Sequence, residues 1–137
     1  MKGIKTRIYT LIILIFSFFF LYSCGEIKEK RKANAVVEEF YKHLNNRDEE
    51  KLKEITNNDF HKYLDIILAS GKDLAIINKI YIINTEIEQE KANVDIKTIY
   101  IDGNANYIQW QLMKKEDKWI IENFKTNTND KEDSIHN

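Results

Sequence analysis

The first 24 residues constrain this chain more than any other stretch. Three cations among the first seven residues precede an almost unbroken apolar run over residues 8–22, and Cys24 follows it. A positive start, an apolar core of about fifteen residues and a small residue at the end are typical of a secretory signal peptide, which is removed rather than folded. We therefore expect residues 1–23 to be a signal peptide and the folded part to begin near Cys24.

The sequence Leu-Tyr-Ser-Cys at 21–24 resembles the lipobox of bacterial lipoproteins, in which a leucine lies three residues before the cysteine and a small residue lies directly before it. In that family the cysteine sulfur receives a diacylglycerol and the signal is cut just before it. The resemblance implies that Cys24 is the lipidated first residue of the mature protein, although Tyr22 departs from the small residue commonest at its position. The implied place is the cell envelope, with the domain anchored to a membrane and facing the periplasm or the cell exterior.

Two other interpretations of this region are open. A transmembrane anchor needs about twenty apolar residues to cross ~30 Å of hydrocarbon, and the run over residues 8–22 is shorter. A cleaved signal with an unmodified Cys24 would leave an exposed thiol in an oxidising compartment, and the chain has no second cysteine to pair with it. Lipidation explains why the single cysteine stands at this position.

Length and charge limit what the mature part can be. Removing the residues before Cys24 leaves 114 of the 137, enough for one domain whose core needs neither disulfides nor metals. The formal charge is −1 for the whole chain and −4 without the three cations of the signal, and lysine and glutamate are interleaved throughout. Nucleic-acid binding requires a basic stripe, so we expect no nucleic-acid partner.

Apolar residues at helical spacing predict three helices after a short charged tether over residues 24–31. The clearest stripe covers residues 33–44 and leaves charged side chains on the opposite face. Asp48 can cap a second, short helix over residues 49–55 by accepting from its unpaired amides. The three- and four-residue spacing then returns over residues 60–68. The first half of the domain is thus predicted to be helical.

In the second half the apolar period changes to two, which is typical of strands. Four strands are predicted, over residues 76–90, 92–101, 107–113 and 119–124. Asp-Gly at 102–103 readily supplies the positive φ angles of a tight turn between two of them. The sequence therefore predicts an α+β domain over residues 32–124, with helices first and an antiparallel sheet after them. Residues 125–137 have almost nothing to bury and are expected to be a disordered tail.

This order of elements resembles the cystatin-like cone of the nuclear-transport-factor-2-like superfamily. Local similarity lies in Phe-Tyr-Lys-His-Leu-Asn at 40–45, in residues 48–52 and in Lys-Glu-Asp-Lys-Trp-Ile-Ile at 115–121. In particular, the chain resembles small lipoprotein families of unknown function that carry a lumazine-binding-like version of the cone, over about residues 31–124. The resemblance implies a bent sheet wrapped on the first helix, with a pocket at the wide mouth.

Enzymes of that superfamily use an aspartate or histidine base inside the cone, beside a tyrosine or a protonated acid. Asp65 lies off the apolar stripe of its helix and Asp95 lies on the polar face of its strand, so we expect both in water and predict no catalytic residue. No two of His43, His61 and His136 have the spacing that brings two ligands to one metal on a helix. No metal or cofactor is predicted.

Two sets of side chains are candidates for binding. The aromatic residues expected to point inward could line a small-ligand pocket or form an ordinary core: Phe40, Tyr63, Tyr100, Trp110 and Trp119. Apolar residues on the opposite strand faces are a candidate interface for a protein partner or a homodimer: Ile99, Ile101, Tyr107, Met113, Ile120 and Phe124.

The sequence thus predicts a membrane-anchored extracytoplasmic lipoprotein that acts as a non-enzymatic module binding a small ligand or a protein. One alternative is an isomerase or dehydratase built on the same cone. Another is a structural or inhibitory lipoprotein that works through the outer face of the sheet.

Overall fold

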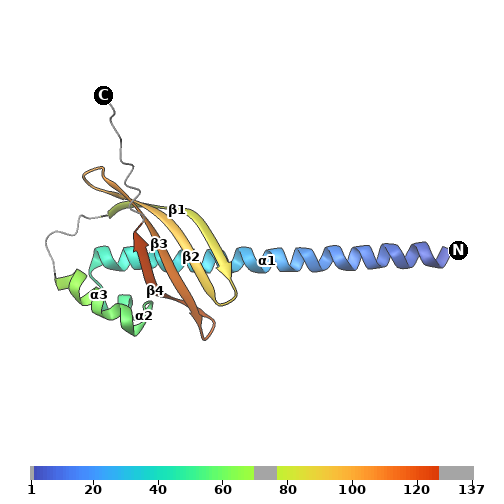
Figure 1. Cartoon of the computed structure of the whole chain (residues 1–137), viewed down its shortest axis with the longest axis horizontal. Helices are drawn as coiled ribbons and strands as arrows, with labels where there is room; N and C mark the ends of the chain where they lie inside the picture. Colours follow the sequence, from blue (N-terminus) through green and yellow to red (C-terminus); the bar gives the residue numbers. More distant parts are fainter. Residues whose placement is uncertain (1, 70–76, 127–137) are drawn as a thin grey trace, which may run out of the picture.

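The computed structural model describes residues 2–69 and 77–126 and consists of three helices followed by one sheet (Figure 1). The elements are α1 (Lys2–Asn46), α2 (Glu49–Glu54), α3 (Asn58–Ala69), β1 (Ile77–Glu88), β2 (Lys91–Tyr100), β3 (Ala105–Lys115) and β4 (Lys118–Thr126). The strands are antiparallel and lie in the order β1-β2-β3-β4. The predicted α+β architecture is confirmed.

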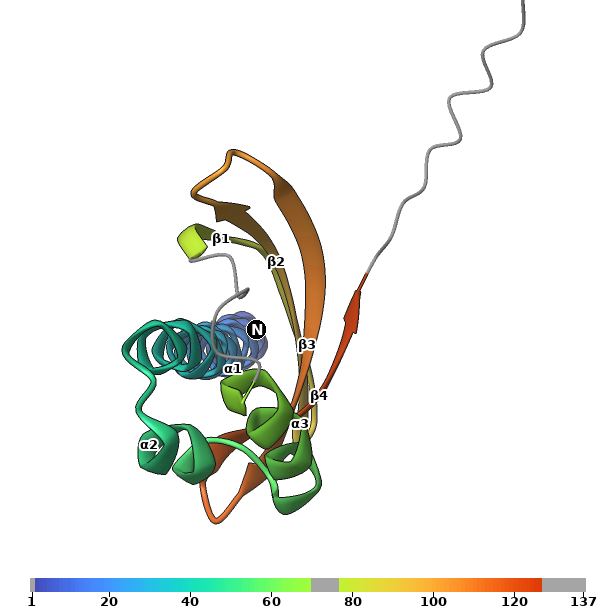
Figure 2. The ribbon, with the colours of Figure 1, turned by 90° about the vertical axis from the view of Figure 1, so that its left-hand side faces the viewer.

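The sheet bends around the second half of α1, as Figure 2 shows in a view along the helix. Both α1 and α3 lie on the concave side of the sheet, and α1 contacts β1, β2 and β4. This is the wrapped, bent sheet that the resemblance implied.

The core forms between the predicted stripe of α1 and the inward faces of the central strands. Burial of such side chains contributes about 1.5–3 kcal/mol each for the larger ones, before conformational entropy is counted against it. The fully buried apolar residues of α1 and the strands are Ala33, Val37, Phe40, Val94, Ile96, Leu112 and Ile121. Since α1 buries its residues only from position 33 onward, the core begins more than thirty residues into the helix.

Arg47 ends α1 in the left-handed conformation, at φ 55°. The amide of Asp48 donates to the carbonyl of His43 at 2.9 Å and that of Arg47 donates to Leu44 at 3.1 Å, the two bonds of a Schellman motif. The side chain of Asp48 accepts from the amide of Lys51, so the predicted cap of α2 is confirmed.

The segment between α2 and α3 pairs with the edge of β4. The amide of Asn57 donates to the carbonyl of Ile121 and the amide of Ile121 donates to that of Ile55, both at 2.9 Å. Thr56 forms a parallel bridge with Ile121. We name residues 55–57 the linker strand. The sequence predicted a helix up to Ile55 and a break over residues 56–59, because no periodic pattern marks so short a strand.

A bulge in β4 changes which way Phe124 points. Leu112 pairs with Ile121, whereas Gln111 pairs with Asn123, so Glu122 is an extra residue on β4. Strict alternation would place Phe124 on the outer face, where it was predicted. The bulge instead turns Phe124 inward, and its ring packs against the core.

The predicted tether over residues 24–31 is helical and continuous with the rest of α1. Glu29 in this segment contacts Lys114 and Trp119 of the sheet, and these contacts hold the segment in the helix. The sequence did not predict them, because both partners lie far away in the chain. The predicted tail also begins later than expected, since Lys125 and Thr126 belong to β4. The rest of the tail, with His136, lies outside the described residues.

Candidate functional site

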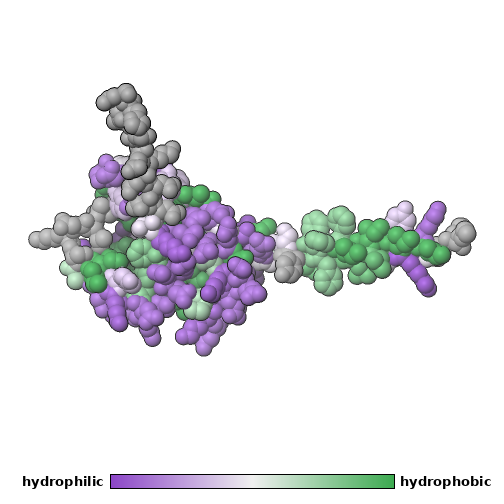
Figure 3. Space-filling view, viewed as in Figure 1, coloured by the Kyte–Doolittle hydropathy of each residue, from purple (hydrophilic) through white to green (hydrophobic). Residues whose placement is uncertain are grey.

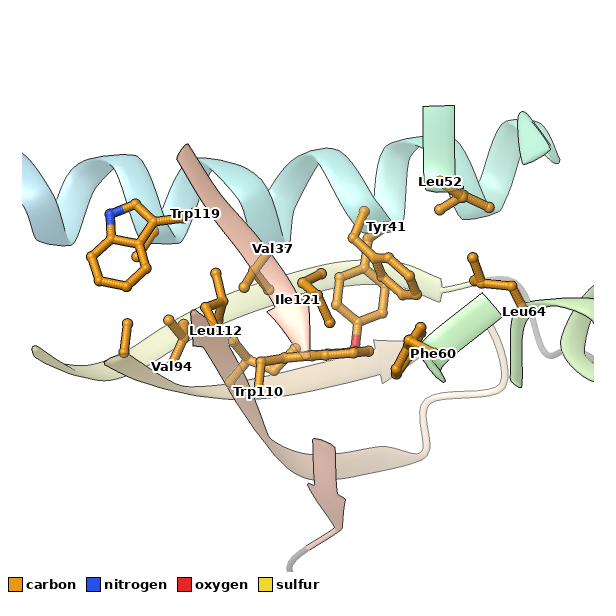
Figure 4. Close-up of a cluster of buried hydrophobic side chains, with 14 residues drawn as sticks. Val37, Tyr41, Leu52, Phe60, Leu64, Val94, Trp110, Leu112, Trp119 and Ile121 are labelled. Carbon is orange, nitrogen blue, oxygen red and sulfur yellow. The ribbon is translucent and has the colours of Figure 1, made fainter. Parts of the chain in front are cut away.

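Packed aromatic rings fill the concave side of the sheet, where the sequence predicted a pocket (Figure 4). Phe40, Phe60 and Trp110 are all buried. The ring centroids of Phe40 and Trp110 are 4.8 Å apart, those of Phe40 and Phe60 are 6.0 Å apart, and Phe124 approaches Trp110 to 5.5 Å. These spacings are those of rings in direct contact. At this place the side chains form a core rather than the lining of a cavity.

A hydrogen bond inside the aromatic cluster pairs the indole nitrogen of Trp110 with the hydroxyl of Tyr41. The indole Nε1 of Trp110 donates to the hydroxyl of Tyr41 at 3.1 Å, and both residues are buried. Burial raises the pKa of Tyr41 well above its usual value, and the bond from Trp110 opposes this only in part. Tyr41 is therefore a neutral structural hydroxyl and not a proton donor near neutral pH.

Tyr63 lies at the edge of this cluster, and the other two predicted pocket residues, Tyr100 and Trp119, lie elsewhere in the domain. Tyr63 on α3 is 52% exposed, and its ring packs edge-on against Phe124. Tyr100 is half-buried at the end of β2, where its hydroxyl accepts from the amide of Asn106. Trp119 is buried at the opposite end of the core from Phe60 (Figure 4). The five residues thus do not surround one space.

The outer face of the sheet is largely polar, and Figure 3 shows it toward the viewer. Cross-strand rows of polar side chains cover its middle, formed by Asp95 with Gln109 and by Asn93 with Gln111. The amide of Gln109 donates to Asp95 at 2.9 Å. A continuous apolar interface therefore does not cross this face.

The residues predicted as an interface form two separate groups. Ile99, Ile101 and Tyr107 lie toward the β2–β3 turn, where Ile101 is 68% exposed and Lys97 lies 5.7 Å from the ring centroid of Tyr107. Met113 and Ile120 pair with each other near the opposite end of their strands. Met113 lies six positions after Tyr107 along β3, which corresponds to about 20 Å.

The acids considered as catalytic bases lie outside the core. Asp65 is exposed and its carboxylate is 3.8 Å from Lys53, whereas Asp95 is half-buried on the outer face. His61 contacts the carbonyl of Lys53 at 3.1 Å, and His43 lies 4.0 Å from the carboxylate of Asp48. Among the residues that the structure describes, no three acids, histidines or cysteines are grouped for a metal.

Two clefts lie on the surface beside the linker strand. One, of about 370 Å³, is lined by residues 56–59 together with Met113, Lys115, Ile120 and Glu122. A second, of about 410 Å³, shares Asn57, Asp59 and Glu122 with it and extends to Tyr63. We name the two together the linker groove. Its residues come from elements more than fifty positions apart, which the pairing of the linker strand with β4 brings together.

The linker groove combines an apolar floor with carboxylates. Met113 and Ile120 supply the apolar surface, while Asp59 and Glu122 supply negative charge. Lys115 adds one positive charge to the first cleft, whereas no basic residue that the structure describes lines the second. Neither carboxylate forms an ion pair within the part of the chain that the structure describes. Unpaired acids beside apolar surface suit a small ligand that carries a cationic group next to an apolar one. Of these residues, only Met113 and Ile120 were singled out from the sequence.

The apolar first half of α1 is exposed on all sides. Residues 3–21 have no buried side chain, and Cys24 is exposed as well. By length and composition this helix is able to cross a membrane, a property that an N-terminal signal sequence shares. The green segment in Figure 3 shows this apolar helix outside the domain.

Glu29 joins α1 to the β3–β4 hairpin. Its carboxylate lies 3.0 Å from the ammonium groups of both Lys114 and Lys32, and it accepts a hydrogen bond from the indole of Trp119 at 3.0 Å. Lys114, followed by Lys32, lowers the pKa of Glu29 to about 2. We name these four residues the Glu29 clamp. Sequence analysis missed it, because a glutamate among lysines carries no sign of a distant partner.

Three solved structures share this fold. An NTF2-like protein of unknown function from Shewanella baltica OS155 is 17% identical, with a TM-score of 0.55 over 73% of this chain and 94% of that chain. A protein from Campylobacter jejuni whose name proposes an NTF2-like transpeptidase is 15% identical, with a TM-score of 0.53 over 66% of this chain and 96% of its own. A SEC-C motif containing protein from Rhodopseudomonas palustris is 12% identical, with a TM-score of 0.58 over 66% and 75%.

No protein-family model matches the chain, and no curated protein matches it either. At 12–17% identity the three structures establish the fold alone. The chain has the NTF2-like cone that its sequence predicted.

Proposed function

We propose that this protein is an extracytoplasmic lipoprotein, anchored by acyl chains on Cys24, whose domain binds a small ligand without chemical conversion. The observation that carries the anchoring is the change along α1. The helix is apolar and exposed up to Leu21, while from Glu29 onward it contacts the domain, and Cys24 stands between the two parts. A lipid attached there would take over membrane attachment once the apolar part is removed.

The proposal of binding without catalysis is supported by the site geometry. The interior that holds the base in cone enzymes is filled here by rings such as Phe40 and Trp110. Asp65 and Asp95 lie outside it. The linker groove offers a ligand a surface cleft with apolar and acidic lining, and its Asp59 and Glu122 favour an amine-bearing one.

Fatty-acid labelling in a bacterial host that processes lipoproteins tests the anchoring. The wild-type chain should incorporate label and lose residues 1–23, whereas Cys24→Ser should remain unlabelled and uncut. Ser23→Ala keeps a small residue before the cysteine, so this control should label normally. An unlabelled wild-type chain that stays in the membrane at full length would instead identify a transmembrane anchor.

Binding is tested by a fragment screen with amine-bearing compounds, followed through backbone amide chemical shifts. Ligands should shift the amides of residues 55–59 and 119–122. Ile120→Arg should abolish these shifts by filling the groove. Ile99→Arg is the matched control, because Ile99 is also half-buried on the outer face but lies near the β2–β3 turn. Shifts that survive Ile120→Arg would exclude the linker groove as the binding site.

A further inference from the structure

The cations that follow Cys24 divide into paired and unpaired ones. Lys30 pairs with Glu26 at 2.9 Å, and Lys32 pairs with Glu29 at 3.0 Å. Lys28 and Arg31 are exposed and form no ion pair with any residue in 2–69 or 77–126. Two positive charges are thus uncompensated within the first two turns after the cysteine.

The unpaired cations share a helix face with Cys24. Lys28 and Arg31 follow Cys24 by four and seven residues, a spacing that places all three on one side of an α-helix. Together with Ile27 and Ala35 they line one open surface. Ala33 and Val37, which are buried against the sheet, lie about half a turn around the helix from Cys24. The cysteine and its two cations therefore face away from the domain.

A membrane surface at Cys24 should interact more strongly with these two nearby cations than with the net negative charge of the more distant domain. Lys28 and Arg31 lie only ~6 Å and ~10 Å along the axis from Cys24. At physiological ionic strength charges are screened over about 8 Å, so the acids of the sheet act weakly on a membrane at Cys24. The nearest acids, Glu26 and Glu29, already have lysine partners. Near an anionic membrane surface each unpaired cation is attracted to the lipid.

We propose that Lys28 and Arg31 bind the phosphates of anionic phospholipids in the membrane that holds the Cys24 acyl chains. This inference rests on the proposed lipidation and adds an orientation to it. The face of α1 that carries Cys24 lies against the headgroups over its first two turns, and the sheet lies on the far side of the helix. Farther along the same side, Glu38 and Glu39 are exposed, so repulsion lifts the helix away from the surface beyond Ala35.

The acylated protein is reconstituted into vesicles of phosphatidylcholine, alone or mixed with phosphatidylglycerol, and its lysines are acetylated with a water-soluble reagent. Mass spectrometry should show Lys28 reacting several-fold more slowly in the anionic vesicles, with the protection lost at high salt. Lys42 is the internal control, because it lies on the same helix side but ~21 Å farther along the axis than Lys28, beyond the two turns that meet the headgroups. Its rate should not depend on the lipid.

Arg31→Gln should reduce the protection of Lys28, whereas Lys30→Gln should leave it unchanged because Lys30 already pairs with Glu26. Suppose that the protein floats with the vesicles and carries acyl chains on its first peptide, and that Lys28 is still acetylated at the same rate in both vesicle types. That result would overturn this inference and leave the proposed lipidation intact. A protein without acyl chains that fails to float would overturn the lipidation and this inference together.

Discussion

The two halves of α1 share one continuous backbone and differ in what surrounds them. Residues 8–21 are apolar on every side and exposed, whereas residues 33–44 carry one apolar stripe that packs against the sheet. A helix that is apolar all round is suited to a membrane, while a striped helix needs only one partner surface. Continuity of a helix therefore does not imply continuity of its role.

The two halves of α1 should differ most in how far the free energy of unfolding changes when one phenylalanine ring is removed from each. Phe40→Ala empties the centre of the aromatic cluster and should lower the free energy of unfolding by about 3–5 kcal/mol. Phe18→Ala removes a ring that is 72% exposed and should change the free energy of unfolding by less than about 0.5 kcal/mol. Urea unfolding of the full chain in detergent, followed by circular dichroism, measures both. Similar losses would mean that the first half also packs against the domain.

A smaller effect should come from the buried hydrogen bond of the second half. Trp110→Phe leaves the Tyr41 hydroxyl without its donor and should cost about 1–3 kcal/mol in unfolding free energy. Tyr41→Phe leaves the indole unpaired instead. The double variant should be less destabilised than the sum of the two single changes, and simple additivity would contradict a coupled pair.

The Glu29 clamp, at the boundary between the halves, should give a pH-dependent effect on the order of 1 kcal/mol. The pKa of Glu29 is about 2 in the folded protein and 4.5 without its partners, so its ionisation stabilises the fold above pH 4.5 and this contribution is lost as pH falls toward 2. Glu29→Gln should lower the melting temperature at pH 7, and the difference from wild type should shrink between pH 4.5 and 2. Glu26→Gln is the control, since its pair with Lys30 is exposed. A difference that stayed constant with pH would show that Glu29 acts only by packing.

The smallest effect is expected at Gly25, where the two halves meet. A methyl group there would meet no atom within 4 Å, so Gly25→Ala should stabilise a continuous helix by up to about 1 kcal/mol. In the mature lipoprotein that we propose, the helix would begin at residue 24 and the same change should have no measurable effect. Melting temperatures with and without Cys24→Ser compare the two cases. A shift of the same size in the protein that keeps Cys24 would indicate that residues 1–23 have not been removed.

The sequence predicted the elements of the fold that depend on local periodicity. The stripe over residues 33–44, the cap at Asp48 and the four strands all follow from local spacing, and the fold followed from their order. The Glu29 clamp and the linker strand depend on partners about 65–90 residues away, which spacing cannot reveal. Phe124 was predicted on the wrong face. Strict alternation assumes one residue per pleat, and the bulge at Glu122 inserts an extra residue that reverses the faces after it.

The same limit applies to the candidate site. Aromatic residues on inward faces could be assigned to the interior, but whether they line a cavity or fill it depends on their mutual distances. The groove arises only because the linker strand brings Asn57 and Asp59 beside Glu122. No local pattern marks those three residues, and their chemistry becomes visible only in three dimensions.

The linker strand also affects how copies of this protein can coexist. Copies anchored to one membrane, as we propose, would collide far more often than in solution, and an unpaired strand edge invites sheet-to-sheet aggregation. By pairing with Ile121, the linker strand covers the start of the β4 edge. The opposite edge, β1, has register irregularities at Ile77/Lys79 and Ile82/Asn84, which disturb the straight ladder that a neighbour would need. Under the proposed anchoring, a crowded layer of these domains would therefore be protected against fusing into one extended sheet.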